Sequence, residues 1–161
     1  MPLDRVSQNA PFTPARPVSP RRPLPTVALR HDLPDGSRHV DWMLARSDDP
    51  AAGLITFRMD APPDELPRGV AAEALRIADH RSAYLAYEGP VPGGRGTVRR
   101  IGRGRIIAWR AEGECRNIEV SWDEPARADV AVMRYRLEPL ADGRWRVRRL
   151  DESPAPAAAE E

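Results

Sequence analysis

Lysine is absent from this sequence of 161 residues, so all 25 of its basic residues are arginines. Arginine stays charged at physiological pH and presents a planar fork of donors that suits phosphate and carboxylate groups. Only one cysteine, Cys115, is present, which excludes an intrachain disulfide and a zinc site built from several thiolates. A single free cysteine is also typical of a reducing compartment, and we therefore expect a cytoplasmic protein.

Long apolar runs are missing as well. No stretch approaches the roughly 18 residues that a membrane span requires, and the N-terminus lacks the apolar core of a signal peptide. The sequence therefore predicts a soluble protein with no membrane partner. Aromatic residues make up only 6% of the chain and hydrophobic residues 41%, so we expect a modest, largely aliphatic core.

Proline is abundant, with 18 residues, and it is frequent toward both ends of the chain. Residues 1–25 combine repeated prolines and arginines with no apolar periodicity, which predicts a disordered arm. Residues 151–161 form a short acidic segment that we also expect to be disordered. The domain that remains, residues 26–150, has the length of a single folded unit.

Alternating apolar and polar residues between Gly and Pro turns indicate many short strands in that domain. Only residues 69–78 have a helical composition, and a strand at the end of this segment is the alternative. This pattern predicts a mainly β protein, a small antiparallel barrel or sandwich with one short helix and disordered termini. The predicted strands are residues 26–31, 38–45, 53–59, 96–102, 104–112, 117–122, 130–140 and 143–150.

The first two predicted strands flank Pro34-Asp35-Gly36, a strong hairpin signal. If these residues form a three-residue loop with Gly36 in the left-handed position, His31 lies directly opposite His39. Paired residues share a face of the sheet, and Asp41 points the same way because it lies two residues beyond His39. A two-residue loop would shift the register and break this arrangement.

Two imidazoles and one carboxylate suit Mn²⁺, Fe²⁺ or Zn²⁺ and leave coordination positions for water or phosphate. The sequence therefore predicts a divalent-metal site formed by His31, His39 and Asp41. The simpler alternative is a strand edge at which His39 pairs with a neighbouring acid.

His80 and Tyr84 lie four residues apart, on one side of a strand or of a helical turn. Both could donate hydrogen bonds to phosphate oxygens, and His80 could stabilise a pentacovalent transition state. We therefore predict that they join His31, His39 and Asp41 in one polar site. The alternative is that Tyr84 is an ordinary strand residue and His80 caps a turn.

No acidic residue occurs between Gly89 and Ala111, although this stretch is rich in arginine. Such a basic run on consecutive strands is a candidate track for a phosphate backbone, and it includes Arg95, Arg99 and Arg100. Alternating arginines also arise on the solvated face of a sheet. The Gly-Gly-Arg-Gly segment is not a P-loop, because it lacks the Gly-Lys-Ser/Thr ending.

Together these motifs resemble the 3′-phosphoesterase domain of bacterial DNA ligase D, which also occurs as small stand-alone proteins. The resemblance covers residues 26–122 and lies in TVALRHD, RHVDW, Asp79-His80 with Tyr84, Tyr87-Glu88-Gly89 and GGRGTV. It implies a compact β-barrel, a Mn²⁺ ion or another divalent transition metal at the predicted site, and phosphate contacts from His80 and Tyr84. Arg38 and Arg76 are further candidates for phosphate contacts.

The same resemblance implies removal of a 3′ phosphate or a terminal ribonucleotide from a primer strand, with a separate DNA ligase or polymerase as a possible partner. The chain departs from the family pattern at several places. Met43 and Ala45 stand where the family has an arginine and a glutamate, and Asp60-Ala61-Pro62 replaces a Pro-Lys-Gly segment. Losing that arginine could leave metal binding intact and abolish turnover. Two alternatives remain open: a catalytically degenerate nucleic-acid-binding barrel that assists repair, and a metallo-phosphoesterase whose substrate is not nucleic acid.

Overall fold

A computed structural model describes residues 23–124 and 132–150. The predicted C-terminal tail, 151–161, and most of the predicted N-terminal arm lie outside the described residues. The last two residues of that arm, Leu24 and Pro25, belong to the first strand, which begins earlier than predicted. No helix in the described part of the chain is long and apolar enough to cross a membrane.

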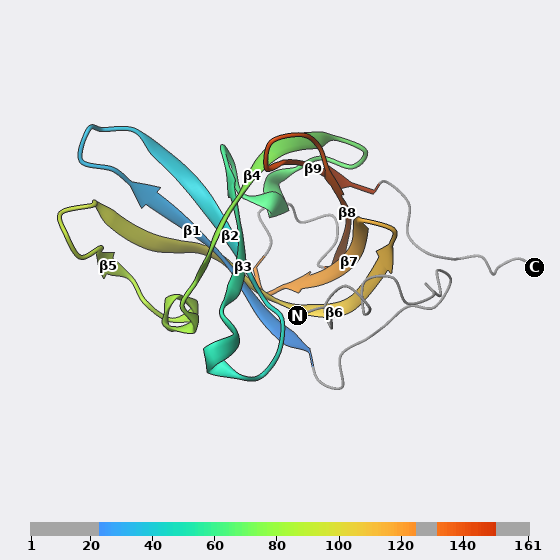
Figure 1. Ribbon diagram of the computed structural model, residues 1–161, viewed down its shortest axis with the longest axis horizontal. Coiled ribbons are helices and arrows are strands. Elements are labelled where there is room, and N and C mark those ends of the chain that lie inside the picture. The colour runs from blue at the N-terminus through green and yellow to red at the C-terminus, as the bar shows by residue number, and fades with distance from the viewer. Residues whose placement is uncertain (1–22, 125–131, 151–161) are drawn as a thin grey trace, which may run out of the picture.

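The fold is a closed antiparallel barrel of eight strands, with a short ninth strand, β5, paired to β6 (Figure 1). Neighbours around the barrel run β1-β2-β3-β4-β9-β8-β7-β6, and pairing of β6 with β1 closes it. The strands are β1 (Leu24–Asp32), β2 (Arg38–Ala45), β3 (Leu54–Met59), β4 (Ala71–His80), β5 (Gly89–Pro90), β6 (Thr97–Glu112), β7 (Cys115–Trp122), β8 (Val132–Pro139) and β9 (Arg144–Arg149). The prediction of a small antiparallel barrel is therefore confirmed.

Two apolar clusters lie on opposite faces of β1 and β2. The barrel core contains Trp42 and Leu44 from β2, together with inward-facing residues of β3, β4 and β6–β9. The outer cluster contains Val27, Leu29, Met43, Ala45, Leu54, Val91 and Val98, with Tyr84 and Leu85 packed against it. Because successive strand residues alternate between faces, His39 and Asp41 lie on the same face of β2 as the outer cluster.

Helical structure is limited, within the described residues, to three short 3₁₀ turns: η1 (Pro50–Ala52), η2 (Pro63–Glu65) and η3 (Ser82–Leu85). The prediction of a helix over residues 69–78 is wrong, because most of that segment is strand β4. Its backbone pairs with β3 on one side and with β9 on the other. Small residues such as Ala74 face the barrel core, so tertiary pairing overrides the helix propensity of alanine.

Residues 96–102 and 104–112, predicted as two strands, form the single long strand β6. Its first half pairs with β1 and its second half with β7. The glycines that suggested a break allow close approach of the neighbouring strand. A Cβ atom on Gly104 would lie only 2.4 Å from the backbone oxygen of Ser121, so glycine is required there.

Candidate metal centre

The β1–β2 hairpin brings the three predicted metal ligands together. Leu33 and Ser37 are joined by a backbone hydrogen bond of 2.8 Å, and Gly36 has a φ of +91°, as expected for the three-residue loop. The Asp35 carboxylate fixes the loop by accepting hydrogen bonds from the backbone N–H and the hydroxyl of Ser37. The predicted register is confirmed, because His31 pairs directly with His39.

His31, His39 and Asp41 each offer one ligand atom, and these atoms all lie within 4.8 Å of one another. The two imidazole rings meet edge to face, with centroids 4.9 Å apart. Nε2 of His39 is 3.4 Å from Oδ1 of Asp41, and both atoms are buried without a hydrogen-bond partner. Buried polar atoms are nearly always satisfied, and a divalent cation would satisfy both of these.

The ring of His31 is oriented by the glycine-rich segment. Its Nε2 lies 2.7 Å from the backbone carbonyl oxygen of Arg95. A carbonyl can only accept, so Nε2 carries the proton in this hydrogen bond and Nδ1 of the neutral ring keeps a lone pair. Carbonyl partners of this kind commonly hold metal-binding histidines in place. The next residue, Gly96, permits the contact, since a Cβ there would lie 2.0 Å from the backbone oxygen of Asp32.

Burial is the main reason that the pKa of His39 lies below its ordinary value. The positive charge of Arg58 and the neighbouring His31 lower this pKa further, while the Asp41 carboxylate acts in the opposite direction. A lowered pKa keeps the imidazole neutral at neutral pH. Metal binding requires this neutral form, because a protonated nitrogen has no lone pair to donate.

The free energy of unfolding of the metal-free protein should therefore fall as the pH is lowered through about 6.5, the ordinary pKa of histidine. Below that pH His39 is protonated in the unfolded chain but stays neutral in the folded chain, and this difference favours unfolding. Urea unfolding at pH values from about 8 to about 5 measures this effect. The His39→Gln variant should lose the dependence; an unchanged pH profile in that variant would contradict the assignment. The lowered pKa values of Glu112 and Glu138 also make the free energy of unfolding depend on pH, but only below their ordinary pKa of 4.5.

Arg58 lies next to two of the predicted ligands, Asp41 and His39, although the sequence did not identify it. It is the β3 partner of Asp41, and its Nε lies 3.6 Å from Oδ1 of that carboxylate. The sequence could have placed Arg58 beside Asp41 only through the register of β2 and β3. The connection over residues 46–53 is too long to define that register. Met43, where the family pattern has an arginine, is instead buried in the outer cluster.

His80 and Tyr84 form a second pair rather than a part of the same ligand group. Their ring centroids are 5.5 Å apart, and Nδ1 of His80 lies 3.0 Å from the carbonyl oxygen of Ala78. Leu54 pairs with His80 on one side and with Ala45 on the other. Since Ala45 lies four residues beyond Asp41, the second pair is displaced by about 13 Å along the strand direction. Both groups lie on the face that carries the outer cluster.

The five arginines predicted to contact phosphate are dispersed. Arg100 pairs with Leu29 and so lies on the face of the predicted ligands, whereas Arg99 pairs with Arg30 on the opposite face. Arg38 lines a pocket of about 330 Å³ together with His39 and Asp60. The other two arginines are engaged locally: Arg76 forms an ion pair with Asp79, and Nε of Arg95 donates to the carbonyl oxygen of Pro92.

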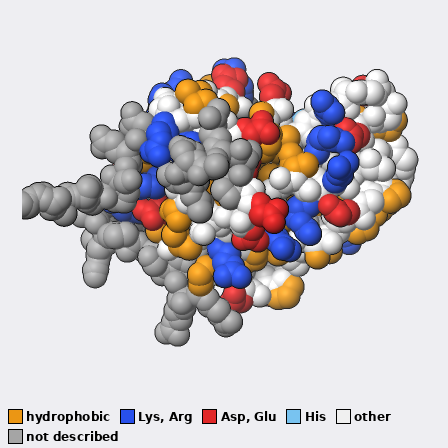
Figure 2. Space-filling view, turned by 180° about the vertical axis from the view of Figure 1, so that it is seen from behind, with side chains coloured by type: hydrophobic (Ala, Val, Ile, Leu, Met, Phe, Trp, Pro, Cys, Tyr) orange, Lys and Arg blue, Asp and Glu red, His pale blue; other side chains and the backbone are white. Residues whose placement is uncertain are grey.

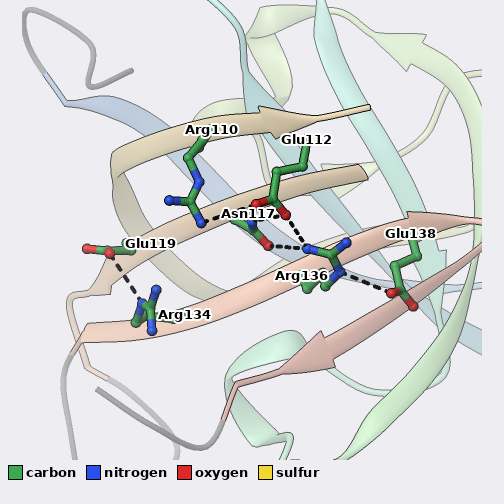
Figure 3. Close-up of polar contacts among 7 residues, drawn as sticks. All are labelled: Arg110, Glu112, Asn117, Glu119, Arg134, Arg136 and Glu138. Carbon is green, nitrogen blue, oxygen red and sulfur yellow. Dashed lines mark hydrogen bonds and ion pairs between the residues drawn. The ribbon is translucent and has the colours of Figure 1, made fainter. Parts of the chain in front are cut away.

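Many arginines of the C-terminal strands are paired with acids on the outside of the barrel (Figure 3). Arg136 binds Glu112 at 2.7 Å and Glu138 at 3.0 Å, and Arg134 binds Glu119 at 3.3 Å. Basic and acidic side chains are likewise interspersed on the face shown in Figure 2. The arginines of the C-terminal strands therefore form a solvated sheet face. In the described part of the chain, the side chains of Arg38, Arg99 and Arg100 have no acidic partner within 4.0 Å.

Comparison of the chain with protein-family models and with curated proteins finds no match. A function for the site is therefore proposed from the geometry and chemistry of its residues and from the short motifs that resemble the ligase D domain.

Proposed function

We propose that this protein is a metal-dependent 3′-phosphoesterase that removes phosphate or a terminal ribonucleotide from nucleic-acid 3′ ends during repair. The observation that supports the proposal most is the convergence of His31, His39 and Asp41, with two of their polar atoms buried and unsatisfied. Mn²⁺ is the cation we favour, because of the resemblance to the ligase D domain and because two imidazoles with one carboxylate suit it.

In this proposal the three residues hold a cation that polarises the phosphate and lowers the pKa of a bound water. The carbonyl of Arg95 accepts the Nε2 proton of His31, so that the lone pair of the neutral ring lies on Nδ1. His80 and Tyr84 lie farther along the same face. Their separation from the three ligands favours contact with the nucleotide chain beyond the terminal phosphate over proton transfer at that phosphate.

The experiment that tests the proposal is hydrolysis of a labelled primer–template with a 3′ phosphate, measured with Mn²⁺ and with a chelator. We expect release that depends on the metal and is absent in the His39→Ala variant. Arg144→Gln is a control outside the candidate site. Arg144 lies on β9 and forms an exposed ion pair of 3.6 Å with Glu73. Equal release by His39→Ala and the wild type would contradict the proposed site. A small aromatic phosphomonoester is tested in parallel. Its hydrolysis without release from the primer–template would indicate a phosphoesterase whose substrate is not nucleic acid.

A second candidate function is supported by Arg38, Arg99 and Arg100, whose side chains have no acidic partner among the described residues. Under this alternative the barrel binds nucleic acid without catalysis and assists a separate ligase or polymerase. Binding would then weaken steeply with salt, because neutralising phosphates releases counterions. It would also survive His39→Ala, which separates this function from the first.

A further inference from the structure

Arg58 occupies a distinctive position beside the candidate metal centre. It lies directly opposite Asp41 on the neighbouring strand, so both side chains share the face that carries His39. Its Nε is 3.6 Å from Oδ1 of Asp41, the same oxygen that lies 3.4 Å from Nε2 of His39. One carboxylate oxygen is therefore approached by a cationic group and by an imidazole at the same time.

None of these three atoms has a hydrogen-bond partner, although all three are buried. The contacts are close enough for electrostatic attraction, but Asp41 bonds neither neighbour with good geometry. Leaving buried polar atoms unsatisfied has a free-energy cost, and a charged atom such as Arg58 Nε has a larger one. A bound group that contacts these atoms would remove that free-energy cost.

The rest of the Arg58 side chain remains accessible. Its side chain is 42% exposed, whereas that of Asp41 is only 3% exposed. Asp41 is thus fixed in the wall of the barrel, while Arg58 reaches it from the solvent side. A partly exposed arginine can turn away from a carboxylate without leaving its own charge buried.

We propose that Arg58 exchanges partners when the centre is loaded: it neutralises Asp41 in the metal-free protein and binds a phosphate oxygen of the substrate once a divalent cation is held there. This inference rests on the proposed function. A cation bound by Asp41 repels the guanidinium, which is then free to turn outward. Its planar donor fork matches a phosphate group, and the bond formed is charge-assisted.

Two opposite effects follow from this exchange. Arg58 competes with the cation for Asp41, so it weakens metal binding when no phosphate is present. It strengthens phosphate binding once the metal is present. A residue that merely held Asp41 in place would strengthen the binding of both the cation and phosphate, or of neither. Opposite effects on these two affinities therefore identify the exchange.

The test measures two affinities for the wild type and for Arg58→Gln: that of the metal-free protein for Mn²⁺, by electron paramagnetic resonance of the free ion, and that of the Mn²⁺-loaded protein for inorganic phosphate, by calorimetry. We expect Arg58→Gln to bind Mn²⁺ about threefold more tightly, the effect of removing a partly exposed ion pair. We expect it to bind phosphate about tenfold more weakly, since one charge-assisted hydrogen bond is lost. Arg144→Gln, which removes an ion pair of equal length, should change neither affinity.

Arg58→Lys provides a second variant in case Arg58→Gln does not fold. It keeps the charge and loses the planar fork, so Mn²⁺ affinity should stay near that of the wild type while phosphate affinity falls. Weaker Mn²⁺ binding by Arg58→Gln, or unchanged phosphate binding, would overturn the inference and leave the proposed function standing. Failure of the wild type to bind Mn²⁺ at all would overturn the proposed function and this inference together.

Discussion

Replacing Asp41 with asparagine is expected to lower the affinity for Mn²⁺ by at least about 100-fold and to abolish release of the 3′ phosphate. Losing an outer partner of a metal ligand already costs about 10–100-fold, and Asp41 is the only anionic member of the ligand group. Asparagine keeps the shape of the side chain, so the barrel should remain folded. Mn²⁺ titration followed by the primer–template assay measures both effects.

The effect of Asp41→Asn must be separated from a general loss of structure. Asp79→Asn is a suitable comparison, because it removes a carboxylate that pairs with arginines at the end of β4, away from the three ligands. Asp79→Asn should bind Mn²⁺ like the wild type. If Asp41→Asn keeps wild-type affinity and turnover, His31, His39 and Asp41 do not form the metal centre.

The largest loss of stability is expected from replacing Trp42 with alanine, at about 3–5 kcal/mol. Trp42 is completely buried at the centre of the barrel core, where its ring contacts Phe57, Trp122 and Tyr135. Truncation removes that packing and leaves a cavity that close-packed strands cannot fill. Urea unfolding gives the free energy, and the melting temperature should fall by at least about 10 °C.

A milder variant tests which part of Trp42 matters. The indole N–H donates to the hydroxyl of Thr26, which itself donates to the backbone carbonyl of Met43. Trp42→Phe keeps an aromatic ring but leaves the Thr26 hydroxyl with one partner fewer, so the expected loss is about 1–3 kcal/mol. If Trp42→Ala costs no more than Trp42→Phe, packing of the ring does not stabilise the barrel.

The hairpin and its three candidate ligands could be predicted from the sequence because both are local. A short loop containing Gly36 allows only a few registers, and the three-residue form is the one that places His31 opposite His39. The mainly β class, a small antiparallel barrel or sandwich, also follows from local alternation of apolar and polar residues. These parts of the structure require no knowledge of distant pairing.

The rest depends on pairings between strands that are distant in sequence or joined by long connections. Arg58 reaches Asp41 only because of the β2–β3 register, and Arg95 reaches His31 only because the glycine-rich segment packs against the end of β1. The displacement of His80 from the other histidines follows from the β3–β4 pairing in the same way. The incorrect helix over 69–78 has the same origin, since alanine-rich composition says nothing about two flanking strands.

The hairpin has a further consequence for the order of folding. His31 and His39 lie eight positions apart, whereas closure of the barrel pairs Leu24 with Ile106. Short loops close faster and at a lower entropic cost than long ones, so the two imidazoles can meet while most strands are still unpaired. The surroundings that bury His39 are complete only after the distant strands have joined. If the proposed centre binds a cation, a cation present during refolding would meet the candidate ligands early and be enclosed late.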